Sequence, residues 1–251
     1  MTTRVKVAND PRPAWRQKTW DQMAQENALA AVMTTDEMVS ATIPSQTHLE
    51  SFFAKGQALF DRHLKPLLRP GLIVEYGCGP GRILQAVAGA GFQCAGVDIS
   101  PTMIELGRRL VPDVDLHVLD NGKSALPDGC ASMVYSYAVV QHISSLDAYT
   151  MAFDEMCRLL APGGLLVVQV SCDDLRSGLD HKGRTENFEL HSVHYPETGA
   201  PYRYDQNNWT GVCIGHDLQV RMLSERGLVF DGWRPHKASP SRVWWLSAHR
   251  P

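Results

Sequence analysis

An acid and three alternate glycines stand together after a short apolar run. Glu75 is followed by Gly77, Gly79 and Gly81, and residues 72–74 directly before them are Leu-Ile-Val. Glycine adopts backbone conformations that other residues avoid, and it lets the main chain approach a ligand closely. The helical pattern that follows would point its free N–H groups at the same place. This spacing predicts a turn that binds a nucleotide-like cofactor, although short glycine-rich turns also serve as plain connections.

Two further acids follow at the ends of the next apolar runs. Asp98 closes the run that begins at Cys94, and Asp120, with Asn121 beside it, closes a third run from Val114. In a βαβ unit the acid at the end of the second strand faces the glycine turn and can accept from ribose hydroxyls. Each acid could instead cap a helix or belong to a turn. Their order along the chain favours three strand ends that meet at one crevice.

The stretch from residue 70 to residue 170 resembles the class I S-adenosylmethionine-dependent methyltransferases. That family places an acid and a G-x-G-x-G turn after its first strand, as Glu75 and the three glycines stand here. Val134–His142 is similar to the family's fourth strand and exit loop, and Arg158–Gln169 to its next helix, turn and strand. A dinucleotide fingerprint would need its third glycine where Arg82 stands.

The resemblance implies S-adenosyl-L-methionine as the cofactor and S-adenosyl-L-homocysteine as the product. It assigns the ribose hydroxyls to Asp98 and the adenine to Asp120 with Asn121. The predicted cofactor-binding residues are Glu75, Tyr76, Gly77, Gly79, Gly81, Arg82, Asp98, Ile99, Asp120, Asn121, Val140 and Trp20. Acids suit the cationic sulfur of this cofactor, and alignment of nucleophile, methyl carbon and sulfur can supply about 7–11 kcal/mol of the barrier.

His142 follows the predicted fourth strand and is a candidate general base. An unperturbed histidine has a pKa of about 6.5 and could take a proton from an acceptor hydroxyl or amine. It could equally orient the backbone or cap the next helix. His191 and His194 are alternative candidates further along the chain. An acceptor that is a thiol, an enolate or a free amine would need no protein base.

Residues 172–215 look neither helical nor strictly alternating, and they are rich in aromatic side chains. Such a segment inside a compact domain is usually a lid or a binding loop. In the family this region commonly builds the acceptor pocket, so Tyr195, Tyr202 and Trp209 are predicted to contact substrate, unless they only anchor the surface. Tyr137–Gln141 lacks the Asn/Asp-Pro-Pro-Tyr/Phe stretch of enzymes that methylate amines of bases or glutamine amides.

The elements that must position these residues alternate as in an α/β protein. We predict an N-terminal helical cap at 1–68 and a Rossmann-like domain at 69–251, with the substrate lid inside it. The resemblance implies a seven-stranded, mostly parallel sheet with one antiparallel strand and helices on both faces. A helix at 217–225 and strands at 228–233 and 242–249 would complete it.

Composition limits the class of protein. The chain has 251 residues, of which 44% are hydrophobic, and a net charge of −3, which gives no support to a nucleic-acid binder. Its six cysteines form no C-x-x-C pair, so we expect reduced structural thiols and no metal site. No secretory signal and no apolar run of about 18 residues is visible, so we expect a cytoplasmic protein without membrane contact.

Together these features predict an enzyme that transfers a methyl group from S-adenosylmethionine to an oxygen or nitrogen of a small metabolite. A dinucleotide-dependent oxidoreductase on a related sheet is one alternative, and a non-catalytic S-adenosylmethionine-binding protein is another. The acceptor, the pathway and the oligomeric state have no signature in the sequence.

Overall fold

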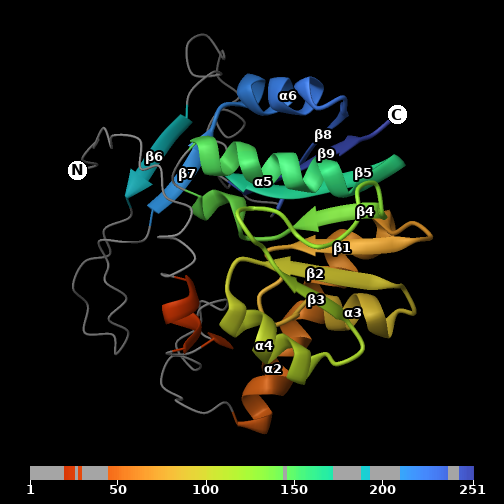
Figure 1. Cartoon of the computed structure of the whole chain (residues 1–251), viewed down its shortest axis with the longest axis vertical. Coiled ribbons are helices and arrows are strands. Elements are labelled where there is room, and N and C mark those ends of the chain that lie inside the picture. Colours follow the sequence, from red (N-terminus) through yellow and green to blue (C-terminus); the bar gives the residue numbers. More distant parts are fainter. Residues whose placement is uncertain are drawn as a thin grey trace.

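A seven-stranded sheet forms the centre of the molecule. The computed structural model describes residues 20–25, 28–29, 45–143, 146–171, 188–192, 210–236 and 243–251, with the backbone alone at 171, 188–192 and 210–214. The strand order of the sheet is β3-β2-β1-β4-β5-β9-β8 (Figure 1). A separate two-stranded sheet pairs β6 with β7.

The elements follow one another along the chain as strands and helices in near alternation. The strands are β1 (Leu72–Tyr76), β2 (Cys94–Asp98), β3 (Asp115–Val118), β4 (Ala131–Ser136), β5 (Leu160–Ser171), β6 (Phe188–Ser192), β7 (Thr210–Ile214), β8 (Val229–Pro235) and β9 (Val243–His249). The α-helices are α2 (Gln46–Leu59), α3 (Leu84–Gly89), α4 (Pro101–Leu110), α5 (Leu146–Leu159) and α6 (His216–Glu225). Short helical segments are η1 (Phe60–Leu64), η2 (Lys65–Leu67) and η3 (Val140–His142), and residues 20–25 and 28–29 are also helical.

The directions of the strands match the predicted sheet. Strands β3, β2, β1, β4 and β5 run parallel to one another, whereas β9 runs antiparallel to both β5 and β8. The prediction of one antiparallel strand in a mostly parallel sheet is therefore confirmed. The carboxyl ends of the parallel strands meet at one edge, where ligands bind in open α/β sheets.

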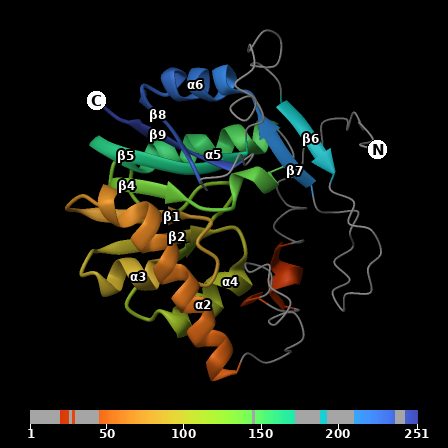
Figure 2. The same ribbon diagram turned by 180° about the vertical axis from the view of Figure 1, so that it is seen from behind.

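Alternation along the strands divides the core into two layers. On β1, Ile73 packs with η1 and α3, whereas its neighbour Val74 packs on the opposite face with α5 and α6. Figure 1 shows α5 in front of the sheet, and the reverse view in Figure 2 brings α2 and α3 to the front. Burial on both faces explains why these strands are continuous apolar runs in the sequence.

The predicted lid contains regular structure that its sequence did not indicate. Strands β6 and β7 pair antiparallel, with Phe188 opposite Ile214 and Ser192 opposite Thr210. The expectation of an irregular segment is wrong for these two stretches, because their pairing joins residues far apart in the chain, which no local pattern indicates. The division into a cap at 1–68 and a domain at 69–251 stays a prediction.

Gly96 on β2 allows the sheet to pack closely against the glycine turn. A Cβ at this position would lie 2.6 Å from Cys78 Sγ and from Leu84 Cδ1, and 2.8 Å from Leu116 Cδ2. We therefore expect Gly96→Ala to lower the free energy of unfolding by about 1–3 kcal/mol in chemical denaturation. Gly89→Ala is the matched control, because a Cβ there meets nothing within 4 Å. Equal effects of the two substitutions would contradict this account.

Candidate functional site

The glycine turn leaves β1 at the carboxyl edge of the sheet. Gly77, Gly79 and Gly81 have φ values of +76°, +51° and +86°, a region that only glycine adopts without cost. The N–H groups of Gly77 and Cys78 donate to the carbonyl oxygen of Val97 at 2.7 and 3.1 Å. These bonds tie the turn to β2, so its path is set by the backbone of the neighbouring strand.

Asp98 lies beside this turn, as the sequence predicts. Its Oδ2 accepts the N–H of Gly79 at 2.8 Å, and its Oδ1 accepts the N–H of Ser100 at 2.9 Å. Burial raises the pKa of Asp98, and the backbone hydrogen bonds partly offset that effect. A carboxylate has about four lone-pair sites, so each oxygen can still accept a hydroxyl from a ligand.

Asp120 and Asn121 follow the end of the adjacent strand. The N–H of Leu119 donates to the carbonyl oxygen of Asp98 at 2.8 Å, which brings the second and third strand ends together. Both Asp120 and Asn121 are exposed, and Asn121 Nδ2 donates to Asp120 Oδ1 at 3.0 Å. The structure thus places them at the predicted edge, while their contact with adenine stays a prediction.

Glu75 lies in the interior, a position that its sequence did not indicate. Its side chain is only 3% exposed, and the Tyr135 hydroxyl donates to Glu75 Oε2 at 3.0 Å. Burial raises the pKa of Glu75 to about 8, although the Tyr135 hydrogen bond and the charge of Arg82 act in the opposite direction. The carboxyl is therefore mostly protonated at neutral pH in the protein without cofactor.

Arg82 extends beneath helix α2. Its guanidinium carbon is 5.9 Å from the centre of the Phe52 ring and 5.7 Å from that of Tyr137, within the range of cation–π attraction. Burial lowers the pKa of Arg82. Arg82, which stands where a dinucleotide fingerprint would have its third glycine, thus fastens the turn to α2 and to the end of β4.

Three other predicted cofactor residues lie in or against the main core. Tyr76 and Val140 are buried in the main core, and the half-buried Ile99 packs against it. Ser136 Oγ donates to the carbonyl oxygen of Tyr76 at 2.9 Å. Their side chains support the carboxyl edge, and their contact with a cofactor stays a prediction.

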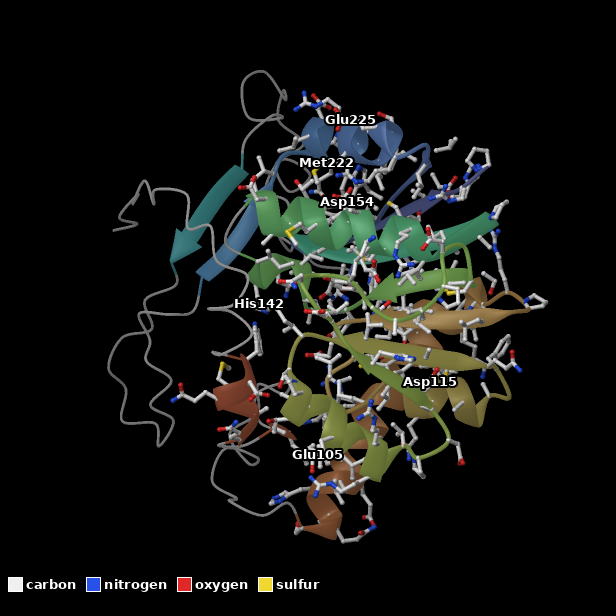
Figure 3. The ribbon with its side chains drawn as sticks, in the orientation of Figure 1. Glu105, Asp115, His142, Asp154, Met222 and Glu225 are labelled. Atoms are coloured by element: carbon white, nitrogen blue, oxygen red, sulfur yellow. The ribbon has the colours of Figure 1, made fainter. Side chains whose placement is uncertain are left out.

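His142 lies at the carboxyl edge (Figure 3). It ends η3, where its N–H donates to the carbonyl oxygen of Val139 at 2.9 Å. Its ring centre is 5.9 Å from that of Trp20, in an edge-on arrangement. Strand β7 also contacts η3. The structure therefore brings two predicted residues, His142 and Trp20, together beside the small sheet.

Asp21 makes contacts with the start of α4 that the sequence did not indicate. Its Oδ1 accepts from Ser100 Oγ at 2.7 Å and from the N–H of Thr102 at 2.9 Å. Burial opposes ionisation of Asp21, but hydrogen bonds from Thr102, Ser100 and Gln25 outweigh it and lower the pKa. The helical leader is thus fastened next to Asp98. Ser100 before a proline signals a helix start, but no local pattern identifies a partner so distant in sequence.

The predicted lid residues are not placed. His191 belongs to β6, where its backbone is opposite Gly211, but its side chain is not described. His194, Tyr195, Tyr202 and Trp209 lie outside the described residues. Their predicted roles as base and substrate contacts stay untested.

Metal and membrane features can be judged for the described part of the chain. There, no group of three or more His, Cys, Asp or Glu side chains could hold a metal ion, and Cys78, Cys94, Cys130 and Cys157 are free thiols. Within the same residues, no helix is long and apolar enough to cross a membrane.

The residues that form this site match the model of a known protein family. The family model described as "Methyltransferase domain" matches residues 74–168, from β1 into β5. This chain carries a class I S-adenosylmethionine-dependent methyltransferase domain. The glycine turn, Asp98 and the loop after β4 all lie inside it.

Curated relatives share this domain but only part of their length. The trans-aconitate 2-methyltransferase of Methylobacterium radiotolerans is 33% identical over 108 residues, which cover 42% of this chain and 40% of the relative. The probable tRNA methyltransferase 9B of Mus musculus is 30% identical over 103 residues, 41% of this chain and 22% of the relative. The chain thus matches less than half the length of either protein.

A solved structure extends the similarity of fold beyond the methyltransferase domain. The 1,6-didemethyltoxoflavin-N1-methyltransferase of Burkholderia thailandensis superposes with a TM-score of 0.62 at 15% identity, covering 99% of this chain and 93% of that one. At this identity the match shows the fold alone.

The buried Glu75 predicts a pH dependence of stability. Its pKa is about 8 in the folded protein against an ordinary value of 4.5. Stabilisation from the protonated group is complete below the unfolded pKa and is lost as the pH rises through the folded one. As the pH rises from the unfolded pKa to the folded pKa, we expect the free energy of unfolding of wild type to fall by at least about 1 kcal/mol relative to that of Glu75→Gln. Urea unfolding at several pH values measures this difference. The exposed Glu105→Gln is the control, and a constant difference for Glu75→Gln would contradict the buried, protonated state.

Proposed function

We propose that this protein transfers a methyl group from S-adenosyl-L-methionine to an oxygen or nitrogen of a small-molecule metabolite, with S-adenosyl-L-homocysteine as product. The main support is the bond between the Gly79 N–H and Asp98, which places an acid beside a glycine turn at the carboxyl edge. The residues suit the cofactor, since the turn has no Cβ atoms and the acid keeps free lone pairs.

Each cofactor-binding residue has a proposed part. Asp98 accepts from the ribose hydroxyls, and Asp120 with Asn121 contacts the adenine. The three glycines allow close approach of the backbone, and Tyr76, Ile99 and Val140 form the apolar wall. Glu75 and Arg82 support the turn from beneath, where Glu75 is buried and Arg82 is half-buried. When bound, the cofactor supplies a methyl group that its cationic sulfur has already activated.

The protein's own catalytic contribution is positioning and proton transfer. His142 is the proposed base, taking a proton from the acceptor O–H or N–H onto a ring nitrogen. Trp20, against which its ring lies, covers it and helps to exclude water. His191 and His194 are second candidates for the base, and Tyr195, Tyr202 and Trp209 are proposed to line the acceptor pocket in the lid.

Small molecules are favoured as acceptors over nucleic acids. Two of the compared methyltransferases are named for the small molecules trans-aconitate and 1,6-didemethyltoxoflavin. The net charge of −3 offers little attraction to a polyanion. One relative is named as a tRNA methyltransferase, so tRNA is included as an alternative acceptor below. The family match disfavours the oxidoreductase alternative, and we further propose a cytoplasmic location, consistent with the free thiols.

A labelling experiment tests the activity. The protein is incubated with methyl-labelled S-adenosylmethionine and either a small-metabolite extract or bulk tRNA. We expect label in a small compound, which mass spectrometry can identify. Label in tRNA would overturn the acceptor class, and cofactor binding without any transfer would favour the non-catalytic alternative.

Asp98→Ala tests the proposed contact between Asp98 and the cofactor. Loss of a hydrogen bond to a charged group costs about 1.5–3 kcal/mol, so we expect cofactor affinity to fall at least about tenfold in calorimetry. Asp113→Ala removes an exposed acid before β3 and should bind the cofactor as wild type does. Unchanged affinity in Asp98→Ala would remove this residue from the site.

His142→Ala tests the proposed base. General base catalysis typically contributes about 10²–10⁴-fold, so we expect label transfer to slow by about a hundredfold or more. Calorimetry with S-adenosylmethionine should show nearly unchanged affinity. Transfer at the wild-type rate would leave His142 with a structural role.

A further inference from the structure

Ala138 has a backbone conformation that its surroundings must support. Its φ is +57°, in the left-handed region, where a non-glycine residue costs about 1–2 kcal/mol. It lies between β4 and η3, so it directs the chain toward Val139 and His142. The Val139 side chain fills the space beside the glycine turn, because a Cβ on Gly77 would lie only 2.3 Å from it. The conformation of Ala138 therefore affects both the turn and the proposed base.

Gln169 supplies that support from the neighbouring strand. It lies on β5 and is 3% exposed, and its Oε1 accepts the N–H of Ala138 at 3.0 Å. A backbone N–H can only donate, so the amide oxygen must face Ala138 and the amide nitrogen must face the other way. This settles the orientation of the Gln169 amide without reference to any other contact.

The amide nitrogen of Gln169 then determines the protonation of His236. Gln169 Nε2 lies 3.1 Å from His236 Nδ1. Because an amide nitrogen only donates, Nδ1 must accept and carry no proton. His236 is therefore neutral, with its proton on Nε2. A second proton on the ring would set two donors against each other and break the link to Gln169.

Rings and cations surround His236. Its ring centre is 4.8 Å from that of His63 on η1, 5.8 Å from Tyr137 after β4 and 6.0 Å from Trp245 on β9. Arg234 on β8 donates to the carbonyl oxygen of His63 at 3.0 Å, and its guanidinium lies over Trp245.

The charged groups of this cluster favour neutral histidines. Burial is the main cause that lowers the pKa of His63 to about 4, and positive charge on Arg234, on Arg62 or on a protonated His236 also opposes its protonation. Arg82 lies over the Tyr137 ring and adds another positive charge to this cluster. Since like charges oppose a second positive ring, these neighbours are consistent with a neutral His236.

We propose that Gln169 and His236 are positioning residues for methyl transfer, which hold Ala138 so that Val139 and His142 keep their places at the carboxyl edge. This inference rests on the proposed function. It links the end of β8 to the loop after β4 through two hydrogen bonds, and it makes that loop dependent on a neutral His236. Neither residue needs to touch the cofactor or the acceptor.

Substitutions at both positions test the proposal. Gln169→Leu and His236→Leu should each slow label transfer from S-adenosylmethionine into the metabolite extract by about tenfold to a hundredfold, because small displacements of reacting groups are costly. Affinity for S-adenosylmethionine in calorimetry should fall less than the rate does, since the cofactor meets only the turn, whereas the rate depends on both the turn and His142. The exposed Gln85→Leu is the control and should keep the wild-type rate.

His236→Asn separates positioning from general structural damage. The Asn side-chain oxygen can accept near the place of Nδ1 but does not titrate, so this variant should recover most of the rate at neutral pH. Wild type should lose rate toward acid more steeply than His236→Asn, as protonation of His236 breaks the link. Titration of His142 is common to both proteins and cancels in the comparison.

Nitrogen-15 spectra of the histidine rings provide a readout that needs no acceptor. His236 should carry its proton on Nε2 at about neutral pH. A proton on Nδ1, wild-type rates in both leucine variants, or identical pH profiles for wild type and His236→Asn would overturn the inference. If the leucine variants fail to fold, the asparagine variant and the spectra decide. Absence of label transfer by wild type would instead contradict the proposed function.

Discussion

The hydrogen bonds to Asp98 are the constraint on which the rest of the site depends. One carboxylate accepts from Gly79 in the turn and from Ser100 at the start of α4, and it lies at the end of β2. Most residues of the turn are glycines, so backbone bonds determine much of its path, and the buried Cys78 and the Arg82 side chain add contacts. Asp21 extends the same network to the helical leader through Ser100. A single half-buried acid thus organises the turn, a helix start and the covering segment.

The glycine turn and the loop after β4 form one packing unit. Val139 occupies the space that a Cβ on Gly77 would need, so the glycine is required by a protein neighbour as well as by any ligand. The loop in turn depends on Gln169, which satisfies the N–H of a residue in a strained conformation. Strain at such a position persists only where the surroundings hold it. Strand β5 thereby affects a site to which it contributes no predicted residue.

The three acids at the strand ends differ in their surroundings. Glu75 is enclosed with Tyr135 and has a pKa of about 8, Asp98 is half-buried and held by backbone donors, and Asp120 is exposed. Only Asp98 is both fixed in place and able to accept further hydrogen bonds. For a cationic sulfur donor, ionised carboxylates at the edge are favourable, whereas the neutral Glu75 contributes mainly to the packing beneath the turn.

The sequence by itself determined the positions of the parallel strands along the chain, the glycine turn and the acids at the strand ends. Apolar runs and glycine spacing are local patterns, so β2 is found at its predicted bounds and Asp98 at its predicted place. The family resemblance added the single antiparallel strand. Only the tertiary structure decided that Glu75 is buried against Tyr135, 60 residues away, and that Gln169 meets His236 across 67 residues. Such partners are selected by strand register and side-chain packing between distant segments, and no local pattern of residue types carries that information.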